Sequence, residues 1–191
     1  MIRSKSDLNE WISYERAKYG LAGGIKYFLL FCAGSERAVI WSWQKALRKT
    51  EYYYNTGKKI RYAISLIRLN HKSNKCGLHI GLNVCGKGLK VMHLGSILTN
   101  GGVKMGEDVS LHINTSFVAK GTSDEAPTIG NGCVVGVGAV VMGGVQVADY
   151  VAIGANSVVC KDILEENIAV AGSPAKKVSN NGSLEWGKGK N

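Results

Sequence analysis

The side chains best suited to chemistry in this 191-residue sequence are its four histidines, His71, His79, His93 and His112. An imidazole with a pKa near neutrality can take a proton from a hydroxyl group, and such a positioned base typically accelerates a reaction by about 10²–10⁴-fold. His93, in "VMHLGS", and His112, in "LHIN", lie 19 residues apart. The sequence therefore favours general-base chemistry at one of these two, with His71 on a solvated surface and His79 in a structural role.

Metal and thiol chemistry have less support in the sequence. A zinc hydratase would need three convergent histidines, and the spacing of His79, His93 and His112 does not supply them. The chain opens with "MIRSKSDLNEW", which lacks the apolar core of a secretory signal. We therefore expect no bound metal, free thiols and a cytoplasmic protein. The cysteines, none of which forms a CxxC pair, are Cys32, Cys76, Cys85, Cys133 and Cys160.

An aliphatic residue recurs at every sixth position in the second half of the chain. A sixfold aliphatic period is typical of hexapeptide β-helices, in which three hexads form one triangular coil and coils stack about 4.8 Å apart. The sequence therefore predicts a mainly β fold, a parallel β-helix of hexapeptide repeats, with an α-helical N-terminal region. The residues in phase are Met105, Leu111, Phe117, Ile129, Val135, Val141, Val147, Ile153 and Val159.

The first third of the chain has a different character. Three helices are predicted here. The first begins at Ser6 or Asp7 and stops at Gly20, and the second begins at Ser35 and ends before Gly57. The third begins at residue 58 and gives way to a polar connector that contains His71. Residues 1–75 carry 15 Lys and Arg against 5 Asp and Glu, whereas residues 76–191 carry 9 of each. We divide the chain into a basic helical region (1–75), a β-helix domain (76–178) and a C-terminal tail (179–191).

The positive charge of the helical region admits several partners. Nucleic acid, an anionic membrane surface and an acidic glycan all attract such a segment, and a solvated helix surface is the plain alternative. The apolar run 27–34 is far shorter than the roughly 20 residues that span a bilayer. We expect no nucleic-acid partner, and consider a peripheral contact with an anionic glycan or with the inner face of the membrane.

Two stretches of the repeat resemble a known enzyme family. "VAIGANSVVCKDILEENIAVAGSPAKKV" (151–178) resembles the hexapeptide acyltransferases, which fold as left-handed parallel β-helices. "VMHLGSILTNGGVKMGEDVSLHINTSFVAKG" resembles their serine acetyltransferase branch, and more closely the serine-acetyltransferase-like enzymes of bacterial surface-polysaccharide synthesis. The resemblance covers residues 76–178. It implies a left-handed coil, acetyl-CoA as co-substrate, and a homotrimer with each active site between neighbouring β-helices.

The resemblance also assigns residues to roles. His93 falls on the catalytic histidine of the family and lies where the sixfold register slips, between Val91 and Met105. His112 is the alternative base or an acceptor contact. The lysines are assigned to the phosphates of the coenzyme and the backbone amide near Gly121 to the developing oxyanion. The residues assigned to the coenzyme are Gly121, Gly138, Ala139, Gly154, Ala155, Lys161 and Lys176.

Departures from the serine enzymes bear on the acceptor. Met92 stands where they carry an aspartate, and Glu125 and Ala126 stand where they carry Arg-His. The acidic pair Asp124–Glu125 would repel a carboxylate. We therefore expect direct acetyl transfer to a sugar hydroxyl in capsule, exopolysaccharide or O-antigen synthesis. The alternatives are a serine O-acetyltransferase of cysteine biosynthesis and a non-catalytic trimeric scaffold.

Overall fold

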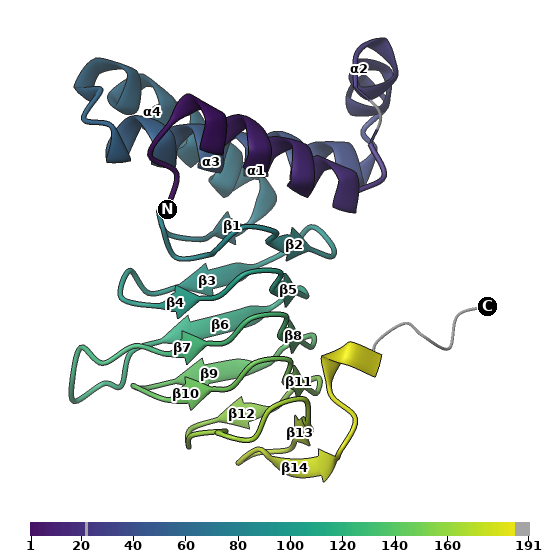
Figure 1. Cartoon of the computed structure of the whole chain (residues 1–191), viewed down its shortest axis with the longest axis vertical. Coiled ribbons are helices and arrows are strands. Elements are labelled where there is room, and N and C mark those ends of the chain that lie inside the picture. The colour runs from purple at the N-terminus through teal and green to yellow at the C-terminus, as the bar shows by residue number, and fades with distance from the viewer. Residues whose placement is uncertain (22, 186–191) are drawn as a thin grey trace.

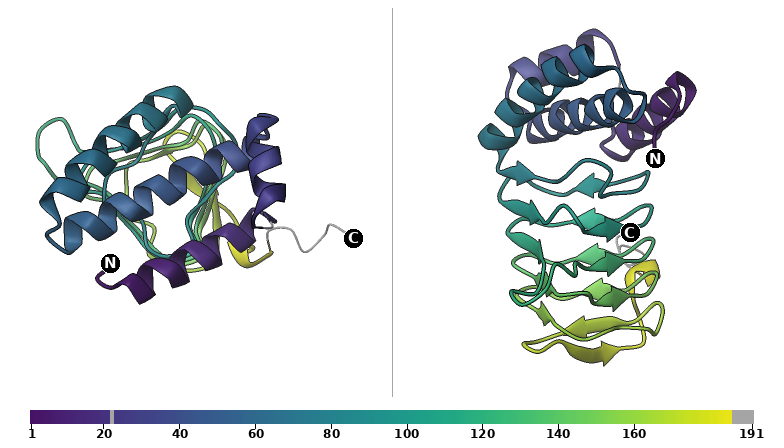
Figure 2. Two further views of the ribbon diagram at one scale, coloured as in Figure 1. Left: turned by 90° about the horizontal axis from the view of Figure 1, so that it is seen from above. Right: turned by 90° about the vertical axis from the view of Figure 1, so that its left-hand side faces the viewer.

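A layer of helices lies across one end of a triangular prism of short strands (Figure 1). The computed structural model describes residues 1–21 and 23–185. Viewed from above, α1, α3 and α4 run across the end of the prism, and α2 lies at its edge (Figure 2). The helices are α1 (Lys5–Lys18), α2 (Ile25–Cys32), α3 (Glu36–Asn55) and α4 (Lys59–Cys76).

The helix ends differ in two places from the sequence prediction. Helix α1 begins two or three residues earlier than predicted, because Ser4 caps it and forms a reciprocal capping box with Asp7. Helix α4 continues through His71 to Cys76 and ends at Gly77, whose φ of 72° places it in the left-handed region. His71 is thus an exposed helical residue rather than part of a polar connector.

The strands form three sheets, one on each face of the prism. Face A consists of β1 (Leu78–His79), β3 (Ile97–Thr99), β6 (Thr115–Val118), β9 (Val140–Met142) and β12 (Val158–Val159). Face B consists of β4 (Lys104–Met105), β7 (Thr128–Ile129) and β10 (Gln146–Val147). Face C consists of β2 (Lys90–Val91), β5 (Ser110–Leu111), β8 (Val134–Val135), β11 (Ala152–Ile153), β13 (Ala169–Ala171) and the antiparallel β14 (Lys176–Ser179).

The sixfold series forms the core, as predicted. Its members are 6% exposed or less, and each strand pairs in parallel with the strand one coil away. A regular coil repeats after 18 residues, as in the pairing of Val140 with Val158. Ser116 pairs with Val140, so that coil has 24 residues. The six additional residues enlarge the turn 119–127, which projects from the prism (Figure 1).

The helical layer supplies polar partners to the first coil, whose outer backbone groups have no further coil to pair with. Buried Arg48 of α3 donates to the carbonyl oxygens of Cys85 (3.0 Å) and Gly86 (2.7 Å). Its charge is balanced by Glu15 at 2.7 Å and Glu51 at 2.9 Å, which are also buried. These two carboxylates accept from backbone amides of the same coil, at Gly88 and at residue 83. The helices therefore cap the β-helix through a fully paired ionic cluster.

Replacing Arg48 by methionine should lower the free energy of unfolding by about 3–5 kcal/mol, because two buried carboxylates lose their counter-charge. Chemical denaturation followed by circular dichroism measures this change. Lys87→Met is the matched control, since Lys87 makes an exposed pair with Glu10 and should cost less than about 1 kcal/mol. Equal losses in the two variants would show that the buried cluster does not hold the layers together.

The three outer faces of the prism differ in their covering. On face C, Val134 and Ala152 are each only 7% exposed, and the segment leading to the 3₁₀ turn η1 (Ser183–Glu185) runs along the turns that enter this face, where the Ser183 amide donates to the Tyr150 carbonyl oxygen. Ser183 anchors this segment by donating to the Gly132 carbonyl oxygen at 2.6 Å. Of the predicted tail 179–191, residues 186–191 lie outside the described residues. No helix within residues 1–21 and 23–185 combines the length and the apolar character needed to cross a bilayer.

Candidate active site

Both candidate histidines lie on one corner of the prism. We name the histidine corner for the stacked turns that lead from face C to face A, namely 92–96, 112–114, 136–139 and 154–157. His93 and His112 belong to the first two of these turns, on consecutive coils. The His93 charge contributes to lowering the pKa of His112, which is consistent with their proximity.

His93 projects from this corner because its turn is longer than the turn beneath it. Val91 pairs with Leu111 and Ile97 pairs with Thr115. The chain therefore needs six residue steps to turn this corner in the first coil and four in the second, so the upper turn is two residues longer. The register slip seen in the sequence is located here. The two additional residues push the turn outward, and the His93 side chain is 58% exposed. His93 can therefore meet a substrate from solvent.

Glu36, the first residue of α3, orients the His93 ring. One oxygen of its carboxylate lies 3.2 Å from His93 Nδ1, and the other accepts from the Leu94 amide at 2.8 Å. The Leu94 hydrogen bond is the main cause that lowers the pKa of the Glu36 carboxyl, with His93 adding to it. Because an ionised carboxylate only accepts, Nδ1 must carry the proton, and Nε2 is then the free base. The geometry thus prepares His93 to accept a proton at Nε2.

Glu36→Gln should reduce kcat by roughly tenfold or more, because the amide NH₂ can donate to Nδ1 and stabilise the tautomer whose Nε2 is already protonated. Glu36→Ala removes the orienting group without imposing that tautomer, so we expect a smaller loss. Steady-state assays with melting temperatures as a check on folding compare the two. Glu10→Gln, in another exposed carboxylate that pairs with a cation, is the control. A larger loss in Glu36→Ala than in Glu36→Gln would contradict the tautomer argument.

His112 is less exposed than His93, and its environment keeps it neutral. Burial is the main cause that lowers its pKa, and the nearby His93 charge adds to the effect. Its backbone carbonyl accepts from the Thr115 hydroxyl at 3.0 Å, which holds the turn. A neutral imidazole beside the exposed base is suited to contact an acceptor. His79, by contrast, lies on face A outside this corner.

The predicted coenzyme residues divide between two corners. Three of them lie on the histidine corner below His112, namely Gly138, Gly154 and Ala155. Lys176 comes after the turn 172–175 and pairs with Ala171 across the β13–β14 hairpin. Close stacking of the coils requires small residues here, since a Cβ on Gly138 would lie 2.2 Å from Asn156 Oδ1. Ala139, in the same turn as Gly138, is fully buried, so its side chain faces the core and its predicted contact with the coenzyme would be made by its backbone.

The remaining predicted residues lie on the next corner, which leads from face A to face B. We name it the loop corner, after the projecting turn 119–127. Gly121 and Asp124 border one hollow of this turn. Glu125 lies in a second hollow of about 440 Å³, together with Lys120 and Lys161. The structure of one chain therefore separates Glu125 from His93 by the width of face A.

Two functional candidates escaped the sequence analysis. Glu36 is 57 residues from His93, and no local pattern connects them. Lys120 directly precedes Gly121, but no repeat or motif in the sequence marks it as a neighbour of Lys161. Within the described part of the chain, no group of three His, Cys, Asp or Glu side chains is arranged to hold a metal ion. All five cysteines are free thiols.

Comparison with known sequences identifies relatives. Residues 126–161 match the family described as bacterial transferase hexapeptide (six repeats). The serine acetyltransferase of Helicobacter pylori strain 26695 is 31% identical over 153 residues, which is 79% of this chain and 84% of that protein. The serine acetyltransferase of Buchnera aphidicola is 32% identical over 146 residues, 74% of this chain. The chain spans about half the length of the Buchnera protein, 52%.

Solved structures share the whole arrangement of helical layer and β-helix. Serine acetyltransferase from Brucella abortus superposes with a TM-score of 0.70 at 21% identity, covering 94% of this chain and 72% of that one. A second structure from that organism, in complex with coenzyme A, has a TM-score of 0.65 at 23% identity and covers 92% of this chain and 68% of the other. The predicted left-handed β-helix with an N-terminal helical region is confirmed.

These matches contradict the predicted sugar acceptor of capsule, exopolysaccharide or O-antigen synthesis, because the matching relatives are serine acetyltransferases. The prediction rested on repulsion of a carboxylate by Asp124 and Glu125. The structure shows the physical reason for the error: the hollow of Glu125 is lined by Lys120 and Lys161 as well as by Asp162, and Asp124 borders another one. The surroundings of Glu125 therefore contain cations as well as anions, and they do not exclude a carboxylate.

Proposed function

The chain belongs to the serine acetyltransferase family of hexapeptide-repeat transferases, and on that premise we propose that it transfers the acetyl group of acetyl-CoA to the hydroxyl of serine. The observation that carries the proposal is the exposed His93, held by Glu36 with Nε2 as the free base. A hydroxyl is a poor nucleophile while protonated, so its acetylation depends on such a base.

The reaction needs no covalent enzyme intermediate. His93 Nε2 takes the hydroxyl proton while the serine oxygen forms a bond to the thioester carbonyl carbon. The carbon–sulfur bond of the tetrahedral intermediate then breaks, and the imidazolium returns its proton to the leaving thiolate. We expect the coenzyme arm to lie along the histidine corner beside the small residues Gly138 and Ala155, and Lys176 at the far end to contact a phosphate.

We propose that the active form is a homotrimer with face A turned toward the threefold axis. Face A carries an apolar outer surface, with Leu98 46% and Met142 37% exposed and Val140 half-buried. The outward side chains of face B are Lys104, Thr128 and Gln146, which favour solvent. Face C is covered by the chain's own C-terminal segment. Burial of the apolar face would stabilise a threefold assembly.

This arrangement brings the two separated corners together. When three prisms each turn one face toward a common axis, the left corner of that face in one copy meets the right corner in the next. The two corners that flank face A are the histidine corner and the loop corner. Each site would then combine His93 of one copy with Lys120 and Glu125 of its neighbour. Serine carries a carboxylate for the lysine and an ammonium for the glutamate.

Incubation of the purified protein with acetyl-CoA and L-serine tests the function. We expect release of the coenzyme A thiol that depends on serine, with O-acetylserine identified by mass spectrometry. L-Alanine, which keeps the carboxylate and ammonium but lacks the hydroxyl, is the control acceptor and should release no thiol above background. Equal thiol release with both amino acids, or none with serine, would refute serine acetylation.

A further inference from the structure

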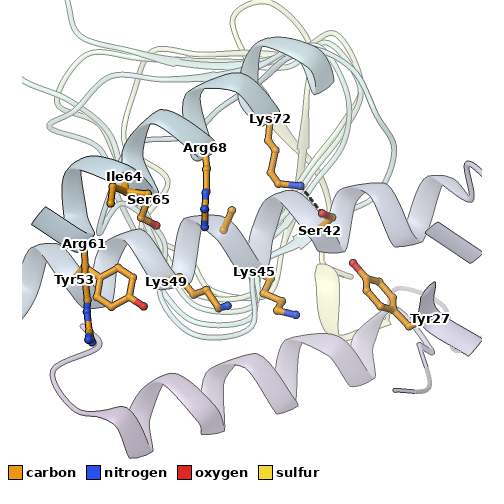
Figure 3. Close-up of a pocket in the computed structure, with 11 residues that line it drawn as sticks. Tyr27, Ser42, Lys45, Lys49, Tyr53, Arg61, Ile64, Ser65, Arg68 and Lys72 are labelled. Carbon is orange, nitrogen blue, oxygen red and sulfur yellow. Dashed lines mark hydrogen bonds between the residues drawn. The ribbon is translucent and has the colours of Figure 1, made fainter. Parts of the chain in front are cut away.

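A groove between α3 and α4 gathers five cationic side chains, none of which belongs to the proposed active site. It has a volume of about 400 Å³ and opens on the side of the helical layer away from the β-helix, whose strands lie behind the helices in Figure 3. Arg68 and Lys72 reach from α4 toward α3 in this view. The cations that line it are Lys45, Lys49, Arg61, Arg68 and Lys72.

The groove lacks the counter-charges that accompany cations elsewhere in this protein. Arg48, Lys87 and Lys177 each pair with a glutamate. No carboxylate lines the groove, and neither α2 nor α4 contains an Asp or Glu. Lys72 makes uncharged contacts, a hydrogen bond of 2.6 Å to the Ser42 hydroxyl and a cation–π contact 5.7 Å from the centre of the Phe31 ring. Five positive charges thus share one concave surface without an anion among its lining residues.

The cations also affect one another across the groove. Burial is the largest cause that lowers the pKa of Lys45, and the charges of Lys49, Arg16 and Lys72 lower it further. Mutual repulsion of this kind destabilises the folded protein. A multiply charged anion in the groove would reverse the effect, because it would interact favourably with every one of these side chains at once. Arginine and lysine together are the usual partners of phosphate groups.

We propose that the groove between α3 and α4 is a binding site for a phosphate-bearing anion, separate from the site of acetyl transfer. Its ligand carries at least two negative charges, in keeping with five cations. Two sources share this chemistry, a soluble phosphate compound and the headgroup of an anionic phospholipid. Exposed apolar side chains also occur on α2 and α4 and could contact a bilayer, so the test must include a lipid surface. Ile64 lines the groove, and Ile60 of α4 and Phe28 of α2 are 78% and 62% exposed.

The test compares a groove variant with a control of equal charge. The groove variant combines Lys45→Gln, Lys49→Gln and Arg68→Gln. The control combines Arg3→Gln, Lys5→Gln and Lys104→Gln, three exposed cations that lie outside the groove. Glutamine keeps much of each aliphatic stem, so both proteins should fold. Removing the repulsion should leave the melting temperature of the ligand-free groove variant equal to or above that of the unaltered protein.

Binding is measured with inorganic pyrophosphate by calorimetry and with vesicles of phosphatidylcholine, with and without phosphatidylglycerol, by co-sedimentation. We expect the unaltered protein to bind one or both anionic probes. The groove variant should bind at least about tenfold more weakly, and the control variant should bind as the unaltered protein does. Added salt should weaken the complex. Pyrophosphate binding identifies a soluble ligand, and binding to anionic vesicles alone identifies a headgroup. Absence of binding to both probes would overturn the proposal, as would equal weakening in the two variants. Because neither probe reports acetyl transfer, these outcomes are independent of the proposed activity.

Discussion

His93→Ala should lower kcat by two to four orders of magnitude, about 10²–10⁴-fold, the usual contribution of a positioned general base. The loss should appear in kcat rather than in KM, since the imidazole acts on the proton that moves in the transition state. The melting temperature and the assembly state should stay nearly unchanged, because His93 is exposed on a turn outside the core. Steady-state kinetics with acetyl-CoA and serine give the measurement.

Two further variants make this result specific. His71→Ala removes an exposed histidine of α4 that is not part of the histidine corner, and it should leave turnover unchanged. His112→Ala should act mainly on the KM of the acceptor, because His112 lies one coil below the proposed base. If His112→Ala reduced kcat more than His93→Ala does, the roles of the two histidines would have to be exchanged. Wild-type turnover in His93→Ala would remove His93 as the base.

Val140→Arg should convert the protein to monomers and reduce activity by at least about 100-fold, because an unpaired charge at the centre of face A prevents close contact between copies. Val140 points outward and pairs in register with Ser116 and Val158, while its neighbour Val141 fills the core. The fold of each chain should therefore survive. Analytical ultracentrifugation gives the assembly state, and activity is measured on the same sample.

Thr128→Arg is the matched control, since Thr128 is an outward and exposed position on face B. Its assembly and activity should match those of the unaltered protein. A sharper test mixes His93→Ala with Lys120→Glu during refolding. In random mixed trimers, about a quarter of the sites combine an intact histidine corner with an intact loop corner of the neighbour, so activity should recover to about that fraction. A fully active monomer, or no recovery on mixing, would place the site within one chain.

The coil and the position of His93 were accessible from the sequence because both depend on local spacing. Every sixth residue points inward in a hexapeptide coil. The sixfold spacing therefore predicted that Val135, Val141 and the other residues of the series are buried, and they are. A slip in that series located the enlarged turn, and His93 lies on it. The C-terminal end of α4 could not be predicted in this way, because its last turns are polar and show no apolar periodicity. These turns are helical because they dock against the first coil.

Contacts between distant segments were decided only by the tertiary structure. Glu36 reaches His93 because α3 is docked on the first coil, and the buried Arg48 cluster, not a sequence pattern, determines that docking. Coil stacking placed Glu125 beside Lys161, residues separated by 36 positions in the chain, and so changed the electrostatic reading of the acceptor site. The period of a repeat reports which residues face inward. The period does not predict which outward side chains contact one another, because those contacts depend on how the coils and helices pack.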